Sequence, residues 1–176
     1  VVLKRSSLSP VIYEVLDFAC GFCDSSGQLV SQTNGITVFT GTFSIQTGII
    51  LEKFGDQLEP GDIYIMNNPF EGGTHYNDVG IVKPIFVDDE LFAFGISISH
   101  WTDVGGKAPG SLPADATEIF QEGICFPAVP LYKAGQPQHT VFEMVEANVR
   151  LPKMALGDLN AAVASVRIAD KRCQEI

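Results

Sequence analysis

Positive charge is scarce in this sequence. Of its 176 residues only 11 are Lys or Arg, against 21 Asp or Glu, so the formal net charge is −10 and the isoelectric point is about 4.6. The cations are spread thinly along the chain, and no basic stripe is available to neutralise phosphate groups. We therefore expect neither nucleic acid nor an anionic membrane as a partner.

Long apolar runs are also missing. No stretch approaches the roughly 18 apolar residues of a membrane-spanning helix, and the opening VVLKRSSLSP lacks the apolar segment and cleavage site of a secretory signal. The 4 cysteines are irregularly spaced, which argues against a disulfide framework in a chain of this size. We expect a soluble, cytoplasmic protein with reduced thiols.

Several catalytic signatures do not occur. Gly72-Gly73 and Gly105-Gly106 lie in neither a GxxxxGKS/T phosphate loop nor a dinucleotide fingerprint, and the sequence has no GxSxG nucleophile elbow. No Ser or Cys is clearly paired with a histidine for nucleophilic catalysis. This chain is therefore not expected to hold the nucleotide or a covalent nucleophile.

Apolar, β-branched segments separated by turn residues predict two β-hairpins. The first covers residues 17–32 and turns at DSSG, and the second joins VGIVKPIFV to LFAFGISIS through Asp88-Asp89-Glu90. Pro84 in the second hairpin suggests a sheet edge or a bulge. The segment DIYIMN predicts one more short strand before the second hairpin.

Helical patterns occupy much of the rest. We expect helices over Phe43–Phe54, ending at Gly55, over 141–149, and from Pro152 onwards, with a short one near 115–121. The helix that begins at Pro152 carries an apolar stripe at three- and four-residue steps: Leu156, Leu159, Val163 and Val166. Nothing in the sequence obviously covers this stripe, so we expect it to support association into an oligomer.

These patterns together predict an α+β fold of mixed or antiparallel β-hairpins with a few helices. With 45% hydrophobic residues the chain can bury one core, so residues 1–176 are expected to form a single domain. Both ends of the sequence are abrupt. We therefore expect a piece of a larger subunit, truncated at both ends.

Two of the three histidines lie in nearly identical segments, THYNDVG at residues 74–80 and SHWTDVG at residues 99–105. If the second hairpin turns at Asp88-Asp89, Asp78 and His100 fall almost opposite each other. His75 precedes Asp78 in a glycine-preceded loop and can reach the same point. Two imidazoles and at least one carboxylate suit zinc, manganese, iron or cobalt better than calcium or magnesium.

Other residues have simpler interpretations. An isolated HxxD is more often a structural loop in which the histidine bonds its own aspartate, and only the duplication and the hairpin favour a metal. Cys20 and Cys23 point to opposite faces of a strand, so they are interpreted as structural cysteines. His139 has no acidic neighbour and is expected on the surface. Asp17 needs a partner if it is buried, but spacing does not connect it to the histidines.

Three long stretches resemble the core of the hydantoinase B/5-oxoprolinase family: GDIYIMNNPFEGGTHYNDVGIVKPIF, SHWTDVGGKAPGSLP and ATEIFQEGICFPAVPLYKAG. DFACGFCDSSGQLVSQ and NVRLPKMALGDLNAAVA resemble its earlier and later stretches. Members are several times longer than this chain. The resemblance implies one divalent transition metal, with zinc or manganese favoured, held by Asp17, His75, Asp78 and His100.

The resemblance also implies a hydantoinase A-like partner subunit that binds ATP and phosphorylates the substrate. The leading hypothesis is the metal-binding catalytic subunit of an ATP-dependent cyclic amide hydrolase of the hydantoinase or 5-oxoprolinase type. One alternative is the B-type subunit of an ATP-dependent ketone carboxylase of the acetone or acetophenone type. Another is a non-catalytic assembly subunit with a structural metal. Asp103 is the candidate catalytic residue, which either orients a histidine or acts as a general base.

Overall fold

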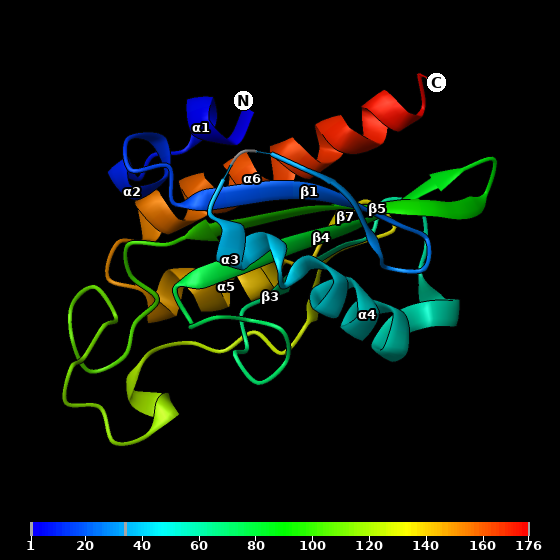
Figure 1. Ribbon diagram of the computed structural model, residues 1–176. Coiled ribbons are helices and arrows are strands. Elements are labelled where there is room, and N and C mark those ends of the chain that lie inside the picture. Colours follow the sequence, from blue (N-terminus) through cyan, green and yellow to red (C-terminus); the bar gives the residue numbers. More distant parts are fainter. Residues whose placement is uncertain (1, 34, 176) are drawn as a thin grey trace.

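One antiparallel sheet forms the centre of the fold (Figure 1). The computed structural model describes residues 2–33 and 35–175. The sheet has 7 strands in the order β2-β1-β5-β4-β3-β6-β7. They are β1 Phe18–Asp24, β2 Leu29–Gln32, β3 Ile63–Met66, β4 Asp78–Val87, β5 Glu90–His100, β6 Val129–Lys133 and β7 Gln136–Pro137. With the helices around it, this sheet confirms the predicted α+β class.

Helices cover both faces of the sheet (Figure 1). They are α1 Val2–Ser6, α2 Pro10–Tyr13, α3 Thr37–Thr40, α4 Phe43–Phe54, α5 His139–Asn148 and α6 Pro152–Cys173, with the short 3-10 turns η1 Gly55–Gln57 and η2 Ile119–Gln121. One face packs against α6, α1 and α5, and the other against α3 and α4. None of the helices in the described residues combines the length and apolarity needed to cross a bilayer.

The side-chain period of the strands explains the two apolar layers. In β3, Ile63 and Ile65 enter the core on the α6 side, while Tyr64 and Met66 enter the core on the α4 side. β4 alternates in the same way. Because both faces are covered, the central strands are apolar on both sides, which is why they read as nearly continuous hydrophobic runs.

Most of the expected elements are present. Both hairpins form, α4 has the predicted bounds, and α6 begins at Pro152. Pro84 pairs with Phe94 in a central strand, so it marks no sheet edge, but the pairing of β4 with β5 shifts register close by, between Ile85 and Phe86. The helix expected near 115–121 is reduced to the 3-10 turn η2.

The apolar stripe of α6 is covered within the chain, so the expectation that it lacked a cover was wrong. Leu159, Val163 and Val166 are buried against the α6 side of β4 and β5. A Cβ added to Gly95 of β5 would lie 3.3 Å from the Ala169 Cβ, so the absence of a side chain lets α6 approach the sheet. Helical periodicity shows that a face is apolar, but not which element it meets.

Truncation of the α6 stripe should destabilise the fold. Leu159 is fully buried, and Leu159→Ala leaves a cavity that should lower the free energy of unfolding by about 2–5 kcal/mol. Ile168→Ala on the same helix is the matched control, because Ile168 is 42% exposed and its loss should cost less than about 1 kcal/mol. Urea unfolding of both variants measures the difference. Equal losses would contradict this packing.

The long segment between β5 and β6 is anchored by Asp103. This buried carboxylate accepts hydrogen bonds from the backbone N–H groups of Gly105, Gly110 and Arg150, at 2.9 to 3.0 Å. The Arg150 guanidinium adds a bond of 3.1 Å to Asp103 and also donates to the carbonyls of Gly105, Gly106 and Ala108. Asp103 and Arg150 therefore fix the course of the loop that follows β5.

The charge of Asp103 should stabilise the fold in a pH-dependent way. Burial by itself raises the pKa of Asp103, but the hydrogen bonds from Arg150, Gly105 and Gly110 outweigh it and hold the pKa below the ordinary 3.8. The unfolded state therefore binds more protons between the two pKa values, and stability rises with pH there. The contribution of the charge is complete above about pH 4 and is lost as the pH falls below that.

Asp103→Asn should lower the free energy of unfolding by about 2–3 kcal/mol at pH 7, because hydrogen bonds to a charged group are lost. The difference from wild type should shrink below about pH 4. Asp115→Asn is the control in the same loop, since its ion pair with Lys107 is at the surface and should contribute about 0–1 kcal/mol. Urea titrations at several pH values test both. A difference that stays constant with pH would refute the role of the charge.

Candidate metal centre

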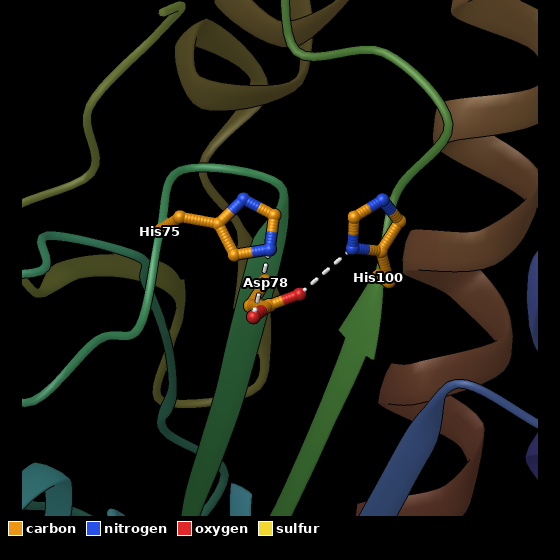
Figure 2. Close-up of side chains that lie close together, drawn as sticks. All are labelled: His75, Asp78 and His100. Carbon is orange, nitrogen blue, oxygen red and sulfur yellow. Dashed lines mark hydrogen bonds and ion pairs between the residues drawn. The ribbon is translucent and has the colours of Figure 1, made fainter. Parts of the chain in front are cut away.

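Two histidines and an aspartate converge where the central hairpin of the sheet ends. Asp78 begins β4 and pairs in register with His100, the last residue of β5, which confirms that the hairpin sets them opposite each other. Figure 2 shows both imidazole rings turned toward the Asp78 carboxylate. His75 Nε2 lies 3.0 Å from Asp78 Oδ2, and His100 Nδ1 lies 3.0 Å from Asp78 Oδ1. The nearest donor atoms of all three residues lie within 4.8 Å of one another.

The loop before β4 holds His75 in place. The Asp78 N–H donates to the His75 carbonyl at 3.0 Å, which closes a tight turn between the two residues. The Thr74 hydroxyl donates to Asp78 Oδ2. Upstream, Gln46 of α4 donates from Nε2 to the Gly72 carbonyl at 3.0 Å, and Gly72 has a φ of +79°, which favours glycine. The turn thus directs His75 back toward the strand end.

Asp17 lies beside this cluster at its rim. The residue after it, Phe18, pairs with Ser99, so β1 brings Asp17 next to His100. The His100 N–H donates to the Asp17 carbonyl at 3.0 Å, and Asp17 Oδ2 lies 3.9 Å from His100 Nδ1. Asp17 is not among the three residues whose donor atoms converge within 4.8 Å. The sheet therefore brings Asp17 near the histidines, a contact that sequence spacing did not supply.

The electrostatics favour an ionised Asp78. Burial raises the pKa of Asp78, but hydrogen bonds from His100, His75 and Thr74 outweigh it and lower the pKa to about 2. The same hydrogen bond to Asp78 raises the pKa of His75. Burial raises the pKa of Asp17; Asp78 adds to that, and His100 opposes it. A carboxylate in contact with two imidazoles is a donor set that fits a zinc or manganese ion.

A cavity of about 540 Å³ lies over the cluster. Asp17, His75 and His100 are among the residues that line it. The rest of the lining comes from the segment between β5 and β6 that Asp103 and Arg150 anchor, and consists of Ser111, Leu112, Pro113, Ala114 and Glu122. The cavity therefore joins the strand ends to a loop wall, with room for a small molecule above the histidines.

Asp103 does not join the cluster. Within the described residues, its hydrogen bonds go to Gly105, Gly110 and Arg150, and none goes to a histidine. The two sequence repeats are not equivalent in space, because Asp78 is the first residue of a strand whereas Asp103 follows the end of one. This placement fits neither catalytic role that the sequence suggested for Asp103, and it makes the residue an anchor of the loop.

The interpretation of Cys20, Cys23 and His139 holds. Cys23 is buried in the core on the α4 side, while Cys20 packs against the core on the α6 side, so the pair does not face one point. Both thiols are free. His139 is exposed at the first residue of α5.

Asn77, which the sequence patterns did not single out, joins the two histidine segments. Its side-chain amide donates to the Trp101 carbonyl at 2.9 Å and to the Gly110 carbonyl at 3.1 Å. The Trp101 N–H donates back to the Asn77 carbonyl at 2.8 Å. The position of Asn77 inside the repeated segment is the sequence feature that could have identified it. The two loops that flank the cluster are therefore connected directly.

Several known proteins are similar to this chain in sequence or in fold. The B-type subunit of a putative D-/L-hydantoinase from Pseudomonas sp. (strain NS671) is 33% identical over 99% of this chain. The crystal structure of the ATP-dependent caprolactamase from Pseudomonas jessenii matches 99% of the chain with a TM-score of 0.93 and 29% identity. A nucleotide-free structure of acetone carboxylase matches 98% of the chain with the same TM-score but 19% identity, which shows the fold alone.

The chain spans 30% of the length of both the hydantoinase subunit and the caprolactamase chain. The family model for hydantoinase B/oxoprolinase matches residues 1–176, the whole of the sequence. This chain therefore belongs to the hydantoinase B/oxoprolinase family.

Proposed function

We propose that this chain is the metal-binding part of a subunit of an ATP-dependent cyclic amide hydrolase. The observation that carries the proposal is the convergence of His75, Asp78 and His100 beneath a cavity of about 540 Å³. Two similar proteins, by their names, act on cyclic amides: a hydantoinase and a caprolactamase. Their shared family and this site together favour a hydrolase.

His75, Asp78 and His100 would hold the metal, with Asp17 as a fourth ligand from the rim. A zinc or manganese ion, when bound, supplies a Lewis acid for a carbonyl or phosphoryl oxygen. The chain itself provides the ionised Asp78, which orients both rings, and the loop wall over them. Leu112, Pro113 and Ala114 make this wall largely apolar, so it excludes water from one side of a bound ring.

Metal binding should depend on the side chains of the proposed ligands. We expect about one zinc or manganese ion per chain in wild type, and its loss in His75→Ala and His100→Ala, because each variant removes one of few ligands. Asp17→Ala should weaken binding less than either, because Asp17 lies at the rim. His139→Ala is the control, since His139 is exposed on α5 and far from any predicted ligand in sequence. Mass spectrometry of the purified proteins measures the metal content.

A wild-type protein that stays free of transition metal after reconstitution would refute the site. Loss of metal in the His139→Ala control would show that the effect is not specific to the cluster. A metal retained by both His75→Ala and His100→Ala would place the ion elsewhere.

The nucleotide is proposed to bind a different subunit. One relative is a B-type hydantoinase subunit and the other is an ATP-dependent enzyme, and this sequence has neither a phosphate loop nor a dinucleotide fingerprint. A hydantoinase A-like partner would bind ATP and activate the amide oxygen. The present chain would then receive the activated ring and complete its opening.

The full-length subunit, combined with its A-type partner, should open a cyclic amide only when ATP is present. Hydantoin, 5-oxoproline and caprolactam are the substrates to test, with the ring-opened product and ADP measured together. His100→Ala should lower the rate by at least about 100-fold, in line with the loss of a preorganised catalytic group.

The same assay with acetone and bicarbonate tests the competing ketone carboxylase. Fixation of bicarbonate without ring opening would contradict the hydrolase and support the carboxylase. A correctly assembled complex that contains its metal but shows neither activity would favour the third possibility, an assembly subunit whose metal is structural.

A further inference from the structure

Glu122 lines the same cavity as Asp17, His75 and His100. We propose that Glu122 is a catalytic residue that carries a proton from the attacking water to the leaving ring nitrogen. This inference rests on the proposed function. It assigns a role in the reaction to a residue that does not bind the metal.

The backbone around Glu122 is held firmly against the loop that follows β5. Its own N–H donates to the Ile119 carbonyl at 3.0 Å, which closes the turn of η2. On either side, the Lys107 N–H donates to the Gln121 carbonyl at 2.7 Å, and the Ile124 N–H donates to the Val104 carbonyl at 2.8 Å. The segment that carries Glu122 is thus bonded to its neighbour along its length.

Two glycines make this close approach possible. Gly123 has a φ of +138°, and a Cβ there would lie 2.5 Å from the Val104 carbonyl oxygen. A Cβ on Gly106 would collide with the Gln121 carbonyl oxygen and would lie 2.7 Å from the Glu122 carbonyl carbon. The backbone directly beside Glu122 therefore has a conformation and a close packing that only glycine accommodates, and this fixes the position of the Glu122 backbone.

The other groups around the cavity are already engaged or have no exchangeable proton. Asp17, His75 and His100 belong to the proposed ligand set. The Ser111 hydroxyl donates to the Gly105 carbonyl at 2.7 Å and accepts from the Val104 N–H at 2.8 Å. The three remaining wall residues are apolar: Leu112, Pro113 and Ala114.

Glu122 differs from all of these. Across residues 2–33 and 35–175, no hydrogen bond or ion pair engages its carboxylate. It is partly exposed, and it is one of the residues that line the cavity. Among the lining residues outside the proposed ligand set, it is the one with a titratable side chain. A carboxylate that is free of structural partners and faces the reaction space is suited to proton transfer.

The step that we assign to Glu122 starts from the activated ring, in which the amide oxygen carries the phosphoryl group and the carbon–nitrogen bond is double. The oxygen of water bonds to the carbon, the π electron pair moves to the nitrogen, and Glu122 accepts a proton from the water and gives it to the nitrogen. The carbon–nitrogen bond then breaks as the new carbon–oxygen bond becomes double, and Glu122 passes the second proton of the water to the nitrogen. The products are an amine and an acyl phosphate, which a second water hydrolyses to a carboxylate and inorganic phosphate, and Glu122 ends as the carboxylate that it was at the start.

The test uses the full-length subunit in complex with its A-type partner, assayed on whichever of hydantoin, 5-oxoproline and caprolactam the wild type opens. Glu122→Gln should lower kcat by about 10²- to 10⁴-fold, the range typical of proton-transfer residues, with KM changed much less. Metal content and melting temperature should stay at the wild-type values, because the side chain holds no ligand and no structural bond. Glu122→Ala should regain part of its rate when formate is added.

Glu118→Gln is the matched control, since Glu118 is an exposed acid four residues earlier that does not line the cavity. Its kcat should equal that of wild type. A Glu122→Gln variant with normal metal content and a kcat within about threefold of wild type would overturn the proposal while the hydrolase function stands. Loss of rate with loss of metal, and without rescue by formate, would overturn it in favour of a structural role. A wild-type complex that opens none of the three rings would overturn both.

Discussion

The antiparallel pairing of β4 with β5 is the constraint on which the site depends. This register sets Asp78 directly against His100 and continues to Ile85 opposite Ala93, beyond which the pairing shifts by one residue before the turn. Because side chains alternate along a strand, a slip of one residue would send Asp78 and every apolar residue of β4 to the wrong face. The packing of both faces therefore enforces the register, and the register in turn positions the cluster.

Different interactions hold the histidine–aspartate cluster and the cavity wall in place. The cluster sits on the ends of central strands, where Asp78 is buried and bonded to both histidines. The wall is a long loop without regular strands, which stays in place because Asp103 and Arg150 bond its backbone. Asn77 connects the two parts through the Trp101 and Gly110 carbonyls. Many active sites combine side chains on rigid secondary-structure elements with a loop that is held in place by hydrogen bonds.

Charge is arranged unevenly around this space. The chain is strongly acidic overall, yet the carboxylates near the histidines are few and each has a distinct environment. Asp78 is held ionised by hydrogen bonds, burial raises the pKa of Asp17 at the rim, and Glu122 stands apart on the wall. A divalent cation beside Asp78 and Asp17 would balance two of these charges, and it would leave Glu122 available for proton transfer.

The sequence by itself determined the two hairpins, the strand between them, the helices α4, α5 and α6, the pairing of Asp78 with His100 and the approach of His75, because these depend on local patterns of residues and on loop length. It also indicated the family through long motifs. Tertiary structure alone decided what covers α6, where Asp103 points, and which loop residue faces the cavity. These depend on contacts between segments far apart in the chain, such as Asp103 with Arg150, and no local pattern specifies which distant partner a side chain will meet.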